Sequence, residues 1–375
     1  VCVDPRSTYA AALGLAWLGQ SGGHRLLGLL GLQGPVAIWE ASSDALCEWG
    51  VPQRVAAAFD VRRRGFLVQR AEEVMQNAGV SFVAYGTAEY PPELRHLDMP
   101  PAGLFVRGVP GVLGRVRSMP RITIVGTRKA SSYGVRATEA FATAFATNGI
   151  AVISGMALGI DGRAHQAALE AGGLTLAVLG CGPDIVYPPR NRWLFDKITA
   201  CGAVVSELPP GAPPARWTFP HRNRILAALG DAVMVIEAPR ASGALQTVTW
   251  ALALGRSVFS VPGSIYAENH RGCNLLLYDG AGVAVDPCVT VEDFLAQTRN
   301  QRNGREPRGG STQAVRCAGE SALRGIGGEA HREDVLMALA SGPASVERLI
   351  ERTGLTAREL TLALVTLELD GLARR

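Results

Sequence analysis

Ile122-Thr-Ile-Val-Gly126, followed by Thr127-Arg128-Lys129, is the first of several similar stretches that decide the fold. Each is an apolar run that stops abruptly at small or charged residues and continues into a helical stretch. The other runs cover residues 151–155, 174–180, 203–207, 232–238 and 257–263. Continuous apolar runs are typical of parallel strands that are covered by helices on both faces. The pattern therefore predicts an α/β domain built on a parallel sheet with helices on both faces.

The ends of these runs are the candidate site, because ligands of such sheets lie outside the carboxyl ends of the strands. The residues that follow these runs include glycines, hydroxyl-bearing residues and arginines, but they form no evident set of catalytic residues. This composition favours binding of an anionic polymer or a phosphate over catalysis. We therefore expect a binding protein and not an enzyme, and the sequence indicates no metal or cofactor.

Composition narrows the class of protein further. A length of 375 residues allows about two or three domains. The formal charge of +4 excludes a histone-like polycation but leaves room for a local basic patch. The seven cysteines form no C-x-x-C pair, which argues for reduced thiols and a cytoplasmic location. No apolar run approaches about 18 residues, so we expect no membrane association.

The sequence pattern divides the chain into four expected segments. Residues 1–65 read as short helices, either a module resembling helix-hairpin-helix or SAM domains or a helical cap without a ligand of its own. Residues 66–298 form the large α/β domain, with strands at 78–85 and 102–107 as an extra edge of its sheet. Residues 299–328 are nearly free of apolar side chains and predict a flexible linker. Residues 329–375 predict a winged-helix-like domain with an incomplete wing.

The first candidate loop is Gly126-Thr127-Arg128, directly after a buried run. Glycine allows close approach of a phosphate to the backbone, threonine offers a hydroxyl and a free N–H, and arginine offers a planar fork. Residues 131–134 then lead into a helix whose N-terminus favours an anion. The alternative is an ordinary turn.

A second loop carries Asp161 and His165, four residues apart on one helix face. This spacing suits a metal or an acid/base pair. We favour a structural interpretation, with Asp161 as an N-terminal cap and His165 packed or hydrogen-bonded nearby.

The densest cluster is Phe219-Pro-His-Arg222-Asn223-Arg224. Arginines for phosphate and an aromatic ring for base stacking are typical of sequence-tolerant single-strand grooves, although a solvated helix start is the alternative. Ser242-Gly243 opens another helix, and Arg256 extends the basic surface. No P-loop is present, and Gly180-Cys-Gly182 lacks the third glycine of a dinucleotide fingerprint.

Together, these motifs closely resemble the DprA (DNA-processing protein A, Smf) family. The motifs in order are Ile124-Val-Gly-Thr-Arg128, Ser154-Gly-Met-Ala-Leu-Gly-Ile-Asp161, Ala164-His165, Ala177-Val-Leu-Gly-Cys-Gly182, Tyr187-Pro188, Asn191, Ser206-Glu-Leu-Pro-Pro-Gly211, Phe219-Pro220, Arg222-Asn-Arg224, Glu237-Ala238, Ser242-Gly243, Gly255-Arg256, Val261-Pro-Gly263 and Gly272-Cys-Asn274. Two departures are Gln246-Thr-Val-Thr-Trp250, in place of an Ile-Thr-Ala pattern, and the incomplete wing.

The resemblance implies an extended Rossmann-like parallel-sheet domain that binds single-stranded DNA and often dimerises. It also implies that the protein loads the RecA recombinase onto incoming strands in natural transformation. The residues that it implies for the DNA pocket are Gly126, Thr127, Arg128, Phe219, Arg222, Asn223, Arg224, Ser242, Gly243 and Arg256. Single-stranded DNA, RecA and a second copy of the chain are therefore the expected partners.

Two other classes of function remain as alternatives. A nucleotide-binding relative, such as a phosphoribohydrolase that cleaves nucleoside monophosphates, needs a carboxylate after the Pro-Gly-Gly-x-Gly-Thr turn. Here Ser242-Gly-Ala-Leu-Gln-Thr247 has no acid following it. The third class is a transcription regulator, whose C-terminal unit reads duplex DNA while the large domain senses a nucleotide.

Overall fold

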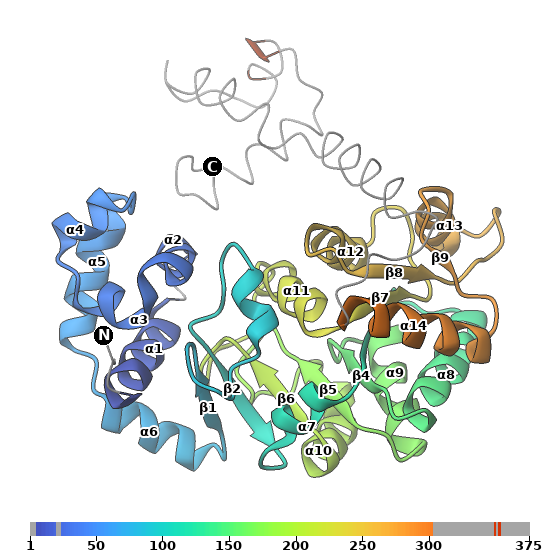
Figure 1. The fold of residues 1–375 in the computed structure, drawn as a ribbon, viewed down its shortest axis with the longest axis horizontal. Coiled ribbons are helices and arrows are strands. Elements are labelled where there is room, and N and C mark those ends of the chain that lie inside the picture. The colour runs from blue at the N-terminus through green and yellow to red at the C-terminus, as the bar shows by residue number, and fades with distance from the viewer. Residues whose placement is uncertain (1–4, 20–23, 303–348, 350–351, 354–375) are drawn as a thin grey trace. The chain divides into compact units, whose positions relative to one another are not determined.

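The computed structural model describes residues 5–19, 24–302, 349 and 352–353 (Figure 1). The chain divides into two units, residues 1–312 and 313–375. The helices and the incomplete wing expected within 329–375 lie almost entirely outside the described residues, as does most of the expected linker. Helix α14 (Pro287–Arg302) runs a few residues past position 298, where the sequence pattern places the start of that linker.

The first unit contains a sheet whose described strands follow the order β1-β2-β6-β5-β4-β3-β7-β8-β9. Their bounds are Ser81–Ala84, Gly103–Gly108, Arg121–Val125, Ala151–Ser154, Thr175–Val178, Ala203–Ser206, Ala232–Val235, Ser257–Ser260 and Gly282–Val283 for β1 to β9. Strands β3 to β9 pair in parallel, and β1 and β2 add an antiparallel edge next to β6. The predicted Rossmann-like sheet and its extra edge are confirmed.

Helices cover both faces of the parallel sheet, which explains the continuous apolar runs. Strand β3 is buried along its whole length, with Ile122 and Ile124 on one face and Val125 on the other. The first face packs against α8 (Ser132–Thr147), α9 (Ile160–Glu170), α10 (Arg192–Cys201) and α14. The second packs against α7 (Val112–Ser118), α11 (Thr218–Leu229), α12 (Ala244–Ala253) and α13 (Arg271–Tyr278).

The N-terminal helices share a core with the β1–β2 edge of the sheet, and Figure 1 shows them beside these strands. They are α1 (Pro5–Leu18), α2 (His24–Gly28), α3 (Leu30–Glu40), α4 (Ser43–Glu48), α5 (Gln53–Arg64) and α6 (Val68–Asn77). The ring centroids of Phe82 and Phe105 lie 4.7 Å apart, and Trp17 packs on Phe105 at 5.9 Å. No helix among the described residues is both long and apolar enough to cross a membrane.

The strand order places a topological switch point at β3. Its neighbours are β4 on one side and β7 on the other, and the chain moves outward in opposite directions from the two. In such sheets the connections after these two strands separate and leave a crevice at the carboxyl edge. The candidate loops after Val125 and Val235 therefore face each other.

Candidate functional site

A cleft of about 580 Å³ lies at this switch point. Its walls come from the ends of β3 and β7, the starts of α9, α11 and α12, and the segment before α10. The lining residues include Gly126, Thr127, Arg128, Asp161, Tyr187, Arg216, Phe219, Arg222, Asn223, Ser242, Gly243, Gln246 and Thr247. Most of the predicted binding residues thus meet in one place.

The β3–α8 loop forms one wall, and its geometry requires a glycine at Gly126. A Cβ atom there would lie 2.6 Å from Ile160 Cγ1 and 2.9 Å from the Glu237 carbonyl oxygen. The backbone N–H of Thr127 donates to that same carbonyl at 2.7 Å. The predicted free N–H of Thr127 is therefore wrong, because it is used within the protein. Arg128 is exposed, and it lines the cleft.

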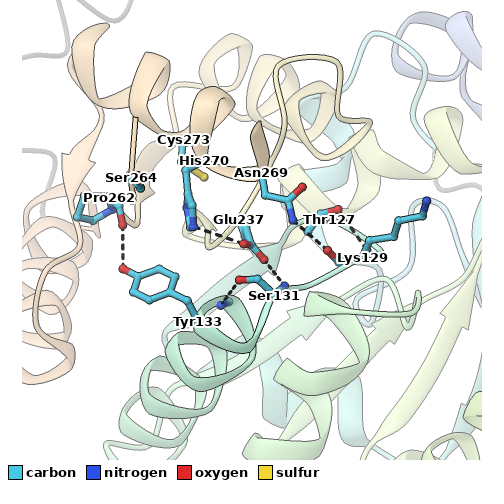
Figure 2. Close-up of polar contacts among 12 residues, drawn as sticks. Thr127, Lys129, Ser131, Tyr133, Glu237, Pro262, Ser264, Asn269, His270 and Cys273 are labelled. Atoms are coloured by element: carbon cyan, nitrogen blue, oxygen red, sulfur yellow. Dashed lines mark hydrogen bonds and ion pairs between the residues drawn. The ribbon is translucent and has the colours of Figure 1, made fainter. Parts of the chain in front are cut away.

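The N-terminus of α8 already holds an anion from within the chain, as Figure 2 shows. The backbone N–H of Ser131 donates to Glu237 Oε2 at 2.8 Å, and Glu237 is fully buried. A Cβ at Gly134 would lie 2.2 Å from the same oxygen. The carboxylate therefore occupies the positive end of the helix dipole. The expectation that residues 131–134 offer this N-terminus to an external anion is wrong for this reason.

Arg222 forms the floor of the cleft and is almost completely buried. Its guanidinium donates to the carbonyl oxygens of Val178 and, at 3.0 Å, of Gly155. Burial lowers the pKa of Arg222 to about 10, and the nearby Asp161 carboxylate opposes that shift. Arg222 therefore stays protonated at neutral pH and supplies a fixed positive charge below the cleft. Its neighbour Asn223 donates to the Gly243 carbonyl at 3.2 Å and ties α11 to the start of α12.

Aromatic rings form the opposite wall. The Phe219 and Tyr187 ring centroids lie 5.4 Å apart, and the Arg128 guanidinium lies 5.4 Å from the Phe219 centroid. This is the geometry of a cation–π contact. Arg216, which is exposed, also lines the cleft. Sequence reasoning missed Tyr187 and Arg216 as site residues, although the Tyr187-Pro188 motif and the cluster that begins at Phe219 lie in this region.

The start of α12 closes the cleft on a further side. Ser242 and Gly243 line it, and the Ser242 hydroxyl accepts from the Ala244 N–H at 3.3 Å. Gln246 and Thr247, which lie in the stretch that departs from the family pattern, line it as well. Thr247 Oγ1 is buried and has no hydrogen-bond partner among the described residues. This hydroxyl is therefore an unsatisfied polar group beside the cleft.

Two of the predicted site residues do not line the cleft. Arg224 is 1% exposed, forms an ion pair with Glu207 and lies 2.8 Å from His221 Nε2. Arg256 is half-buried and donates to the Ala228 carbonyl at 3.3 Å. Arg224 points away from Arg222 because a separation of two residues turns a helix by about 200°. The structure therefore places both side chains in other environments.

Asp161 and His165 have structural contacts of their own. The buried Asp161 carboxylate accepts backbone hydrogen bonds from Ala157 and Gly155, although Gly159 is the residue at the N-cap of α9. Burial raises the pKa of Asp161, and the charge of Arg222 opposes this. His165 Nδ1 lies 2.7 Å from Thr175 Oγ1, and burial lowers the pKa of this imidazole to about 3. Within the part of the chain described, no cluster of three His, Cys, Asp or Glu side chains could hold a metal ion.

Fold and cleft together define an α/β protein with a Rossmann-like sheet and a switch-point cleft of arginines, aromatic rings and helix starts. Two family models match the chain: "DNA recombination-mediator protein A" over residues 81–297 and "DprA winged helix domain" over residues 323–375. The chain belongs to the DNA recombination-mediator protein A family. The expected resemblance and the winged-helix class of the C-terminal segment are thereby confirmed.

Similar proteins come from several bacteria. Protein Smf of Synechocystis is 41% identical over 211 residues, which are 56% of this chain and 53% of that protein. A putative DNA processing protein DprA of Mycobacterium tuberculosis is 38% identical over 250 residues, 67% of this chain and 61% of that protein. The matches thus span little more than half the length of these relatives.

Two solved structures share the fold. DNA processing protein A from Streptococcus pneumoniae aligns with a TM-score of 0.66 and 31% identity, over 77% of this chain and 97% of that one. DNA processing protein A from Helicobacter pylori, described for its single-stranded DNA binding mode, aligns with a TM-score of 0.53 and 27% identity, over 58% of this chain and 96% of that one.

Proposed function

We propose that the switch-point cleft binds single-stranded DNA and that the protein is a recombination mediator without catalytic turnover. The observation that carries this proposal is Arg128 packed on Phe219 beside Tyr187, above the buried charge of Arg222. Arginines attract phosphates, and exposed ring faces stack on bases. A duplex hides the faces of its bases, so this combination favours single strands.

The proposal extends to partners. The family description as a recombination mediator and the solved relative with a single-strand binding mode support a mediator that acts on a bound strand. We propose RecA as its recombinase, because the family resemblance implies this partner. Such a role places the protein in the cytoplasm, where RecA acts. The direct assay is RecA filament formation on a single strand, with and without this protein. No acceleration of filament formation would count against the mediator role but not against strand binding.

We also propose that the protein forms a homodimer through α13 and the β9 edge. The apolar side chains there include Leu275 at 43% exposure, Tyr278 at 88% and Val283 at 55%. Among the described strands, β9 lies at the end of the sheet, and its outer edge pairs with none of them. A second copy would cover this apolar surface by a two-fold contact.

A nucleotide-hydrolysing enzyme is the second candidate, and one observation favours it. The cleft contains a carboxylate, that of Asp161, although the sequence supplies no acid after Ser242-Gly243. Incubation with nucleoside monophosphates decides between the two candidates. Release of free base, lost in Asp161→Asn, would favour the enzyme.

The test of strand binding is fluorescence anisotropy of a labelled oligo-dT and of its duplex, with salt titrated. We expect single-strand binding that weakens steeply with salt.

Arg128→Ala should weaken the free energy of binding by about 1–3 kcal/mol and lower the salt slope by about 1. Phe219→Ala should cost about 1–3 kcal/mol with the slope retained. Arg62→Ala, an exposed arginine on α5, is the matched control. Equal affinity for duplex, or Arg128→Ala without effect, would contradict the proposal.

A further inference from the structure

The loop that carries Arg128 also has contacts with residues that do not line the cleft. The one-turn helix η3 (Glu268–His270) lies beside this loop, with Asn269 near Lys129 and His270 near Glu237 (Figure 2). Asn269 Nδ2 donates to the Lys129 carbonyl at 3.1 Å. His270, the next residue, contacts the Glu237 carboxylate, with Nε2 3.4 Å from Oε1. Asn269 thus contacts the loop directly, whereas His270 contacts Glu237, which is itself hydrogen-bonded to the loop.

Glu237 accepts hydrogen bonds from this loop with both its side chain and its backbone carbonyl. Glu237 Oε2 accepts from the Ser131 N–H at 2.8 Å, and the Glu237 carbonyl accepts from the Thr127 N–H at 2.7 Å. Arg128 is therefore flanked on both sides by residues fixed to Glu237. Its own side chain is exposed, so its position depends on where the backbone holds its Cα atom.

His270 is closely enclosed by its neighbours. It is 5% exposed, its ring meets that of Tyr133 edge-on at 5.1 Å, and a Cβ at Gly263 would lie 2.1 Å from its Cγ. The charged and titratable groups around it are Glu237 from the segment after β7, Tyr133 from α8 and Cys273 from α13. Its imidazole therefore has little freedom to move, and it keeps the carboxylate in place below the start of α8.

We propose that Asn269 and His270 are positioning residues for Arg128. They hold the Thr127–Ser131 segment so that the Arg128 guanidinium stays over Phe219, although neither side chain lines the cleft. This inference rests on the proposed function, because it concerns the affinity of the cleft for single-stranded DNA. Side chains locked by a supporting layer of hydrogen bonds bind more tightly than freely moving ones, since less entropy is lost on binding.

The experiment is a double-mutant cycle on oligo-dT affinity with the full chain. Asn269→Ala removes one amide-to-carbonyl hydrogen bond and should weaken binding by between about twofold and tenfold. Asn148→Ala is the matched control, because Asn148 donates to the Ala144 carbonyl at 2.9 Å at the other end of α8. Combined with Arg128→Ala, Asn269→Ala should have no further effect, since it acts through that arginine.

His270 is tested by two variants that separate its packing from its polar contact. His270→Phe retains a ring beside Tyr133 but lacks the Nε2 atom that contacts Glu237, and it should weaken binding as Asn269→Ala does. His270→Gln keeps a polar side chain beside the carboxylate and should recover most of the affinity. Thermal unfolding of each variant confirms that the chain is folded.

Three results overturn the inference while leaving strand binding intact: no loss in Asn269→Ala, an equal loss in the presence and absence of Arg128, or an equal loss in His270→Gln and His270→Phe. Wild-type protein that does not bind oligo-dT overturns both this inference and the proposed function, so the two failures are distinguishable.

Discussion

Arg222 and Arg224 are two positions apart on α11, yet they meet opposite environments. Arg222 lies below the cleft, whereas Arg224 is buried against Glu207 on another side of the helix. Both belong to the same motif, and the sequence shows that both are positively charged. That the two side chains leave the helix in different directions follows only from the helical geometry. We therefore assign the first to the binding site and the second to the stability of the fold.

The first prediction concerns Arg224. Arg224→Ala leaves the Glu207 carboxylate buried beside His221 without its arginine, which should lower the free energy of unfolding by about 3–5 kcal/mol. Urea denaturation measures this loss. The double variant Arg224→Met, Glu207→Leu removes both charges and should recover much of the stability. An Arg224→Ala protein of normal stability that fails to bind oligo-dT would return Arg224 to the binding site.

The second prediction concerns pH and His165. Burial lowers the pKa of His165 to about 3, whereas an unfolded histidine titrates near about 6.5. The unfolded state therefore binds the proton first as the pH falls. The stabilisation is complete above about pH 6.5 and is lost progressively toward pH 3, by about 2 kcal/mol at about pH 5.

Unfolding free energies of wild-type protein and His165→Gln, compared over this pH range, isolate the contribution of the histidine. Asp161, whose pKa is raised, contributes a slope of opposite sign at lower pH, and this cancels in the comparison. We expect a steeper loss of stability in the wild type. Parallel curves would show that His165 is accessible to protons in the folded protein.

At the scale of elements, the sequence predicts the sheet well because its signal is local. Each apolar run from residue 122 onward became a buried strand, and the runs at 78–85 and 102–107 became the antiparallel edge. Strand β9 was missed because Gly282–Val283 is too short to produce a run. The fold class thus follows from continuous burial, which is visible in a few consecutive residues.

The site is less predictable, because its loops are joined by contacts between distant residues. Arg128, Phe219 and Arg222, which the sequence groups as candidates for one pocket, do line the same cleft. Sequence reasoning did not find that the N-terminus of α8 is filled by Glu237, because the Ser131–Glu237 hydrogen bond spans 106 positions. The sequence does not show which backbone groups already have a hydrogen-bond partner. This is known only when the pairing of the strands is known.

The third prediction concerns the contact between the β3–α8 and β4–α9 loops. Gly159 has a φ of +78°, and a Cβ there would lie 2.3 Å from the Thr127 carbonyl oxygen. Gly159→Ala therefore combines backbone strain with a clash against fixed backbone, and should cost more than about 2 kcal/mol of stability.

Gly172 is the matched control, since its φ is +72° and no atom lies within 4 Å of the added Cβ. Gly172→Ala should cost about 1 kcal/mol, from backbone strain alone. Denaturant unfolding of the two variants measures the difference. Equal losses would mean that the two loops move apart without cost, and the wall of the cleft would not be rigid.

At the scale of the whole molecule, the apolar surface of α13 and β9 lies close in sequence to the residues that support the cleft. His270 directly precedes α13, and Tyr278 is the last residue of that helix. A second copy bound to α13 would restrain the segment that holds Glu237. Self-association and strand binding should then favour each other, because coupling between two sites is reciprocal.

The last prediction tests this surface. Tyr278→Glu places a charge in the proposed contact, and it should convert a dimer into a monomer when mass is measured by light scattering at micromolar concentration. Leu32→Glu, at an equally exposed apolar residue on α3, should leave the dimer intact. A wild-type monomer would remove the dimer proposal. Dissociation by both variants would instead assign assembly to another surface. A monomeric Tyr278→Glu protein that retains full oligo-dT affinity would show that the cleft and the α13 surface act independently.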